Sequence, residues 1–125
     1  MTKPKKANGH APDFLAAAMA RHRQVPVELP AGMNITAFVR TLSAAESRRI
    51  TQACVREGRQ ITDDDAIDNE RLERALLAAA LVDEKGHRLI PEGREDELAD
   101  LPQEIMTPVN QAYNRLQGFA AAPGN

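Results

Sequence analysis

Aromatic residues and cysteines are scarce in this sequence. Tryptophan is absent, and the 125 residues include one tyrosine and three phenylalanines. Proteins that bind single-stranded nucleic acids stack bases on aromatic side chains, so this scarcity argues against that class. Cys54 is the sole cysteine. The sequence therefore offers no disulfide within the chain, and we expect a reducing compartment.

Long apolar runs are also missing. No segment has the continuous apolar length of a membrane span, and the N-terminus lacks the apolar region of a signal peptide. We therefore expect a cytoplasmic protein with no membrane partner. Hydrophobic residues make up 42% of the chain, and no internal repeat is visible. This composition predicts one domain with a modest core.

Motifs for catalysis are absent. The sequence has no G-x-S-x-G elbow, no phosphate-binding G-x-x-x-x-G-K loop and no dinucleotide fingerprint. The carboxylates lie in charged, solvated runs, where nothing would raise a pKa for acid catalysis. Cys54 lies on the apolar face of a predicted helix, which favours a small core residue over a nucleophile. We expect a protein that is not an enzyme and that needs no cofactor.

An acidic segment begins like a calcium loop but does not complete one. An EF-hand loop opening at Asp63 needs an oxygen ligand at its fifth position, glycine at its sixth and glutamate at its twelfth. This chain has Ile67, Asp68 and Arg74 there. The three histidines lack the spacing of zinc ligands. We therefore predict no metal site, and we expect the acids to cap the helix that follows.

Charge is unevenly distributed along the chain. Residues 1–62 carry a net charge of +6 and residues 63–125 carry −8, within a total of −2. Such asymmetry marks an interaction surface, or two halves that attract each other on folding, and we favour the second interpretation. Five arginines would suit a DNA-facing helix: Arg40, Arg48, Arg49, Arg56 and Arg59. No recognition helix follows at a short turn and the next segment is acidic, so we expect no nucleic-acid partner.

The densest apolar run extends over residues 72–82. Its alanines and leucines favour a helix, which we predict over residues 69–81. A turn at Asp83-Glu84-Lys85-Gly86 follows, because glycine readily adopts the positive φ that a tight reversal requires. An extended segment over residues 87–90 then ends at Pro91. We expect this helix, turn and strand to form the core.

Two alternating sets of apolar residues predict a β-hairpin. The sets are Val25, Val27 and Leu29, then Ile35, Ala37 and Val39. They flank a turn at Pro30-Ala31-Gly32. Pro26 cannot donate a ladder hydrogen bond, which places the first strand at a sheet edge. We expect the proline to protect that edge, although an edge strand can also pair with another chain.

Two helices flank this hairpin in the sequence. Pro12-Asp13 starts the first, which ends near Arg23. We expect it to pack on its own domain or to be partly disordered rather than to wait for a partner. Ser43 and Glu46 have the spacing of a capping box and start the second helix, which Gly58 would end.

Two more helices are predicted near the C-terminus. Residues 94–101 suit a short acidic helix that Pro102 stops. Apolar residues at helical spacing then continue as far as Gly118. Because a proline inside a helix breaks it, we expect a kink or a fresh start at Pro108 behind a Thr107 cap.

Together these elements predict a helix-rich α+β protein. A β-hairpin or short antiparallel sheet would pack against three to five α-helices in one small domain over residues 12–118. Residues 1–11 would form a flexible basic arm and residues 119–125 a loose tail.

The order of several motifs carries a family resemblance. The motifs are Val25-Pro26-Val27, the extended Ile35 to Val39, Leu42-Ser43-Ala44-Ala45-Glu46, Leu76 to Val82 with Asp83-Glu84-Lys85-Gly86, and Leu101-Pro102 leading to Leu116-Gln117-Gly118. Over residues 14–118 this ordered set resembles the tail assembly chaperones of long-tailed bacteriophages. The chain departs from many members by having Pro30-Ala31-Gly32-Met33 in place of a tryptophan and a glycine-rich turn.

The resemblance implies a chaperone that acts in the host cytoplasm and is absent from the mature virion. It would bind the tape-measure protein and the tail-tube protein during tail assembly, and such genes often yield a longer, frameshifted form of the same protein. We expect binding through the amphipathic helices and the hairpin. The candidate protein-binding residues are Val25, Val27, Ile35, Val39, Ile105, Val109 and Leu116.

Two other functions stay open at this point. One is a small DNA-binding or regulatory protein, whose affinity would fall steeply with added salt. The other is a structural head–tail connector, which would be found in purified particles.

Overall fold

A three-stranded antiparallel sheet lies at the centre of the computed structural model, which describes residues 10–118. Strands β1 (Gln24–Val27), β2 (Ala37–Arg40) and β3 (Leu81–Asp83) follow one another across the sheet. β1 and β2 form the predicted hairpin, with Val25 opposite Val39. The strands are shorter than the alternation predicted, because residues 28–36 form an irregular loop. β1 occupies the edge, as Pro26 indicated.

The predicted central helix is confirmed as α3 (Asn69–Ala80). The chain passes from α3 directly into β3, so Leu81 belongs to the sheet rather than to the helix. Gly86 adopts a φ of +86° in the turn that follows, as expected. The predicted extension over residues 87–90 is reduced to one isolated bridge between Arg88 and Val82. Pairing stops there because the chain leaves the sheet towards Pro91.

Helix α2 (Ala44–Ala53) begins with the predicted capping box. It ends five residues before Gly58, which corrects the predicted boundary. The cause is tertiary: the amide N–H of Asp68 donates to the carbonyl oxygen of Cys54 at 3.0 Å, and Val55 pairs with Ile67. The Asp68 side chain in turn caps α3, as the acidic segment predicted.

The C-terminal elements are a 3-10 helix, η1 (Glu95–Asp100), and helix α4 (Gln103–Gln117). η1 confirms the short acidic helix. The expected fresh start at Pro108 is wrong, because α4 runs through this residue without interruption. Pro108 removes one hydrogen bond to the carbonyl of Glu104, an exposed residue in the first turn, where solvent can replace the lost donor. Gly118 ends α4 with a φ of +87°.

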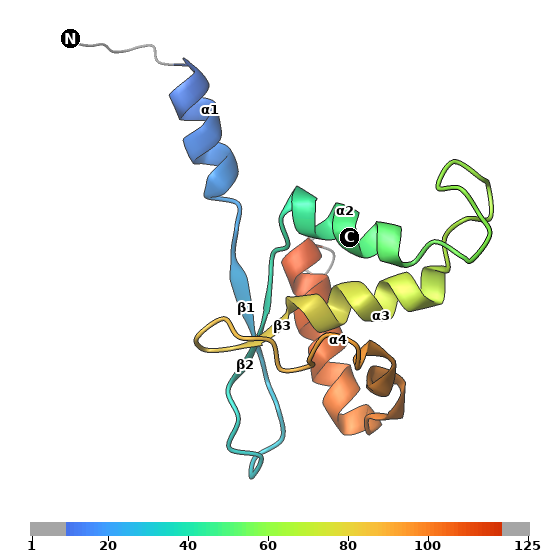
Figure 1. Cartoon of the computed structure of the whole chain (residues 1–125). Helices are drawn as coiled ribbons and strands as arrows, with labels where there is room; N and C mark the ends of the chain where they lie inside the picture. The colour runs from blue at the N-terminus through green and yellow to red at the C-terminus, as the bar shows by residue number, and fades with distance from the viewer. Residues whose placement is uncertain (1–9, 119–125) are drawn as a thin grey trace, which may run out of the picture.

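The hydrophobic core lies between the sheet and the helices (Figure 1). α4 packs on β1 and β2, while α3 packs on η1 and α2. Val39, Val82 and Val109, one each from β2, β3 and α4, are almost completely buried. The helix-rich α+β class is therefore confirmed.

Helix α1 (His10–Met19) extends away from the rest of the described chain (Figure 1). Its apolar residues Phe14, Leu15 and Met19 are 70%, 61% and 63% exposed. The expectation that this helix packs on its own domain is wrong, because no apolar surface of the described chain covers these side chains. Its alternative, partial disorder, stays a prediction. α1 also begins at His10, two residues before the predicted domain boundary. The rest of the predicted basic arm (residues 1–9) and the predicted tail (residues 119–125) lie outside the described residues.

Candidate functional site

An apolar groove opens at the end of the sheet where the hairpin turns. It has a volume of about 510 Å³, and every residue that lines it except Glu104 is apolar. Ala37, Leu81 and Val109 form its buried floor. The floor is the edge of the hydrophobic core, so the groove gives a partner direct access to core side chains.

One wall of the groove is the hairpin loop. It contributes Leu29, Met33 and Ile35, of which Met33 is 38% exposed and Ile35 is 50% exposed. Gly32 and Asn34 flank Met33 and have positive φ values of 101° and 58°. Glycine and asparagine tolerate this region better than other residues, so the sequence itself favours the loop conformation that presents Met33.

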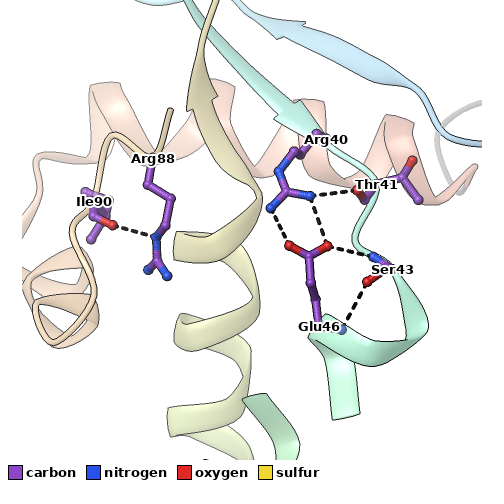
Figure 2. Close-up of polar contacts among 6 residues, drawn as sticks. All are labelled: Arg40, Thr41, Ser43, Glu46, Arg88 and Ile90. Atoms are coloured by element: carbon purple, nitrogen blue, oxygen red, sulfur yellow. Dashed lines mark hydrogen bonds and ion pairs between the residues drawn. The ribbon is translucent and has the colours of Figure 1, made fainter. Parts of the chain in front are cut away.

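The opposite wall contains Leu89 and Ile90 from the segment after β3. Arg88 fixes this segment: its Nε donates to the carbonyl oxygen of Ile90 at 3.0 Å, as Figure 2 shows, and its Nη2 lies 3.3 Å from Glu95 Oε2. The preceding turn is held by Asp83 Oδ1, which accepts from the amides of His87 and Lys85. The His87 amide is the main cause of a lowered pKa for Asp83.

The remaining side of the groove is the junction between η1 and α4. Leu101, Pro102 and Ile105 line it, and the buried Leu98 anchors η1 in the core. Glu104 adds one carboxylate to the rim. The groove therefore combines a wide apolar surface with a single negative charge, which suits contact with an apolar helix face rather than with a small polar ligand.

The structure divides the predicted protein-binding residues into two groups. Val27, Val39, Val109 and Leu116 belong to the core, with exposed fractions of 7%, 0%, 1% and 5%. This burial is a correction: of the four, only Val109 borders the groove, Leu116 borders a separate hollow near the other end of α4, and Val27 and Val39 line neither. The regular spacing of these apolar residues along their strands and helix reflects packing against other elements of the same chain.

The other three predicted residues retain accessible surface. Ile35 and Ile105 both line the groove, although 70 residues separate them in the sequence. Val25 is partly buried and packs against the core from β1. The hairpin and α4 therefore meet at one surface.

Sequence reasoning missed Met33, Leu89, Ile90 and Leu101 as groove residues. They lie in irregular segments beside turns or prolines, where no periodicity marks an exposed face. Their positions beside Gly32, Pro91 and Pro102 could have identified them. Glycine and proline mark places where the chain reverses, and apolar residues at such places often lie at the solvent-exposed edge of a core.

A second hollow, of about 430 Å³, lies near the other end of α4. Arg40, one of its lining residues, forms a bidentate ion pair with Glu46. Its Nη1 lies 3.1 Å from Oε1 and its Nη2 lies 2.8 Å from Oε2 (Figure 2). The side-chain hydrogen bond from Arg40, together with the backbone amide of Ser43, lowers the pKa of Glu46 to about 2. Arg40 on the lining of this hollow is thus held by the same carboxylate that completes the capping box of α2.

Cys54 is buried with 2% of its surface exposed, as predicted for a small core residue, although it follows the last residue of α2 rather than lying within the helix. Burial raises the pKa of its thiol. Among residues 10–118, no three His, Cys, Asp or Glu side chains gather as a metal ion would require. None of the helices described has both the length and the apolarity for a bilayer crossing.

Comparisons with protein-family models, with curated proteins and with solved structures gave no significant match.

Proposed function

We propose that this protein is a bacteriophage tail assembly chaperone that binds other proteins without catalysis. The observation that carries the proposal is the groove formed by the hairpin loop, the segment after β3 and the start of α4. Exposed apolar surface that borders a core is typical of protein-binding sites, since it costs solubility unless a partner covers it.

The proposed client is the tape-measure protein, with the tail-tube protein as a second partner. The resemblance implies that a tape-measure protein is a long helical chain with exposed apolar faces. An amphipathic helix binds by laying its apolar residues into such a groove. Met33 and Ile35 on the hairpin wall and Ile105 at the start of α4 would contact the apolar face of the client helix.

The binding is proposed to be reversible and to occur in the host cytoplasm, with the protein absent from the mature virion. The groove carries Glu104 as its sole ionisable residue, so holding the client depends mainly on apolar contact. A longer frameshifted form would present the same groove, because all the groove residues lie before residue 110.

The test is co-expression with the tape-measure and tube proteins, followed by affinity capture of this protein at low and high salt. We expect at least one partner to be retained at high salt. Ile35→Glu should remove the retained partner, because it places a charge on the apolar wall. Ile61→Glu is the matched control: Ile61 is 51% exposed, almost the same as Ile35, but does not line the groove.

Three outcomes would overturn the proposal. The first is that neither partner is captured. The second is that the Ile35→Glu and Ile61→Glu variants retain the partner equally. The third is that nucleic acid is captured instead and elutes as the salt concentration rises. Two of the five candidate DNA-binding arginines already contact carboxylates of their own chain: Arg40 contacts Glu46, and Arg59 contacts Asp65. Arg56 donates to the carbonyl oxygen of Asp65. These contacts favour the protein-binding proposal.

A further inference from the structure

Helix α1 and the apolar groove are two exposed apolar features of the same chain. Phe14, Leu15 and Met19 on α1 are more than 60% exposed, while Met33 and Ile35 on the groove wall are 38% and 50% exposed. α1 is an amphipathic helix, and the groove has the form that binds such a helix. Each could therefore cover the exposed apolar side chains of the other.

The helix and the groove of one chain lie at opposite ends of the sheet. Arg23, which leads from α1 into β1, is bonded to Thr41 through both its backbone N–H and its carbonyl oxygen, and its side chain donates to the carbonyl oxygen of Leu116. Leu116 is 11 residues from Ile105 on α4, a separation of about 16 Å at 1.5 Å per residue. α4 packs on β1 and β2. In this structure α1 is therefore held away from the groove of its own chain, and a second copy is the nearest source of a helix with the same apolar side chains.

Charge also favours this pairing. The groove carries Glu104 on its rim, and the exposed Glu28 adjoins Leu29 of its wall. α1 is followed by the exposed Arg21 and His22. A helix that enters the groove from a second copy brings positive charge towards these carboxylates.

We propose that α1 of one copy occupies the apolar groove of a second copy, and that the reciprocal contact closes a twofold dimer. A reciprocal exchange uses both helices and both grooves, so neither of these two apolar features is left to recruit further copies. The two equivalent contacts also double the buried area, which brings it towards the roughly 1,200 Å² that stable interfaces bury.

The dimer does not depend on any client. Where the proposed function also holds, a client helix and α1 compete for the same groove, and the groove stays covered until a client displaces α1. This competition rests on the proposed function, whereas the dimer does not.

The test is sedimentation equilibrium of the full chain alone, over a range of concentrations. We expect a mass twice the 13.7 kDa of one chain. Leu15→Glu and Ile35→Glu should each weaken association at least about tenfold, because each would bury a carboxylate in an apolar contact. Ile61→Glu should leave association unchanged. A wild-type chain that stays monomeric at millimolar concentration, or a dimer that is insensitive to both groove-contact variants, overturns the proposal.

Disulfide trapping tests the geometry directly. A Leu15→Cys chain mixed with an Ile35→Cys chain should form a cross-linked heterodimer, while Leu15→Cys mixed with Ile61→Cys should not. The buried Cys54 serves as an internal thiol that is inaccessible in both mixtures. Equal cross-linking in the two mixtures overturns the exchange. Because no client is present, failure here leaves the proposed function standing, and failure of the client capture with an intact dimer overturns only the proposed function.

Discussion

At the scale of single residues, Glu46 is a carboxylate whose pKa is lowered by the folded structure, to about 2. It accepts from the amide of Ser43 at 2.9 Å and from the Arg40 guanidinium, and both partners favour its ionised form. The two side chains of the ion pair are 28% and 29% exposed, so solvent screens the pair only in part. One carboxylate thus joins the end of β2 to the start of α2.

This contact predicts a loss of stability in acid. The pKa of Glu46 falls from an ordinary 4.5 to about 2 in the folded protein. Its contribution is therefore fully present above pH 4.5 and disappears as the pH falls through about 2. We expect Glu46→Gln to lower the free energy of unfolding by about 1–2 kcal/mol at pH 7 and by much less near pH 2, measured by urea denaturation.

The matched control is Glu57→Gln, at an exposed position outside α2. It removes the same charge and should change the free energy of unfolding at pH 7 by less than about 0.5 kcal/mol. If Glu46→Gln lowered stability equally at both pH values, the loss would come from packing rather than from the ionised carboxylate.

At the scale of an element, α4 is the unusual case because it accommodates Pro108 in its interior. The helix survives because Val109, Ala112 and Leu116 are buried against the sheet and compensate for the missing hydrogen bond. Tertiary packing therefore overrides a residue that would stop an isolated helix.

We expect Pro108→Ala to raise the free energy of unfolding by about 1–2 kcal/mol, because it restores a donor to the carbonyl of Glu104. Part of the gain is offset by the greater freedom of the unfolded chain. Thermal and urea denaturation measure the change. Pro91→Ala, in an exposed turn, should give no such gain because it restores no helical hydrogen bond. A destabilising Pro108→Ala would mean that the ring itself packs in an essential way.

At the scale of the whole molecule, the described chain consists of a packed sheet and helices from which α1 projects (Figure 1). Helices of about ten residues are marginal in water on their own. The stability of α1 should thus depend on a partner, whereas that of α4 depends on the core of its own chain.

Hydrogen exchange should report this difference. In dilute solution we expect the amides of α1 to exchange rapidly and those of β2 and α4 to exchange slowly, because only the latter lie in the core. Raising the protein concentration should slow exchange in α1 alone as dimers form. Slow exchange in α1 that does not change with concentration would show that this helix is protected within one chain.

Most of the elements could be predicted from the sequence. The capping box at Ser43, the helix that begins at Asn69, the hairpin with its edge proline and the stop at Gly118 all follow from local preferences. These signals act over a few residues, so they need no knowledge of distant partners. The end of α2 and the passage through Pro108 were not predictable, because each depends on contacts with residues far along the chain.

The sequence by itself determined where most helices and strands of this protein lie, though not all of their ends, and which residues are apolar enough to be buried. Only the tertiary structure decided which of those residues are buried. Val27, Val39 and Leu116 pack in the core, whereas Ile35, Met33 and the apolar residues of α1 remain exposed. The physical reason is that apolar character is a property of one side chain, while burial requires a second surface to cover it, and that surface comes from a distant part of the chain or from another molecule.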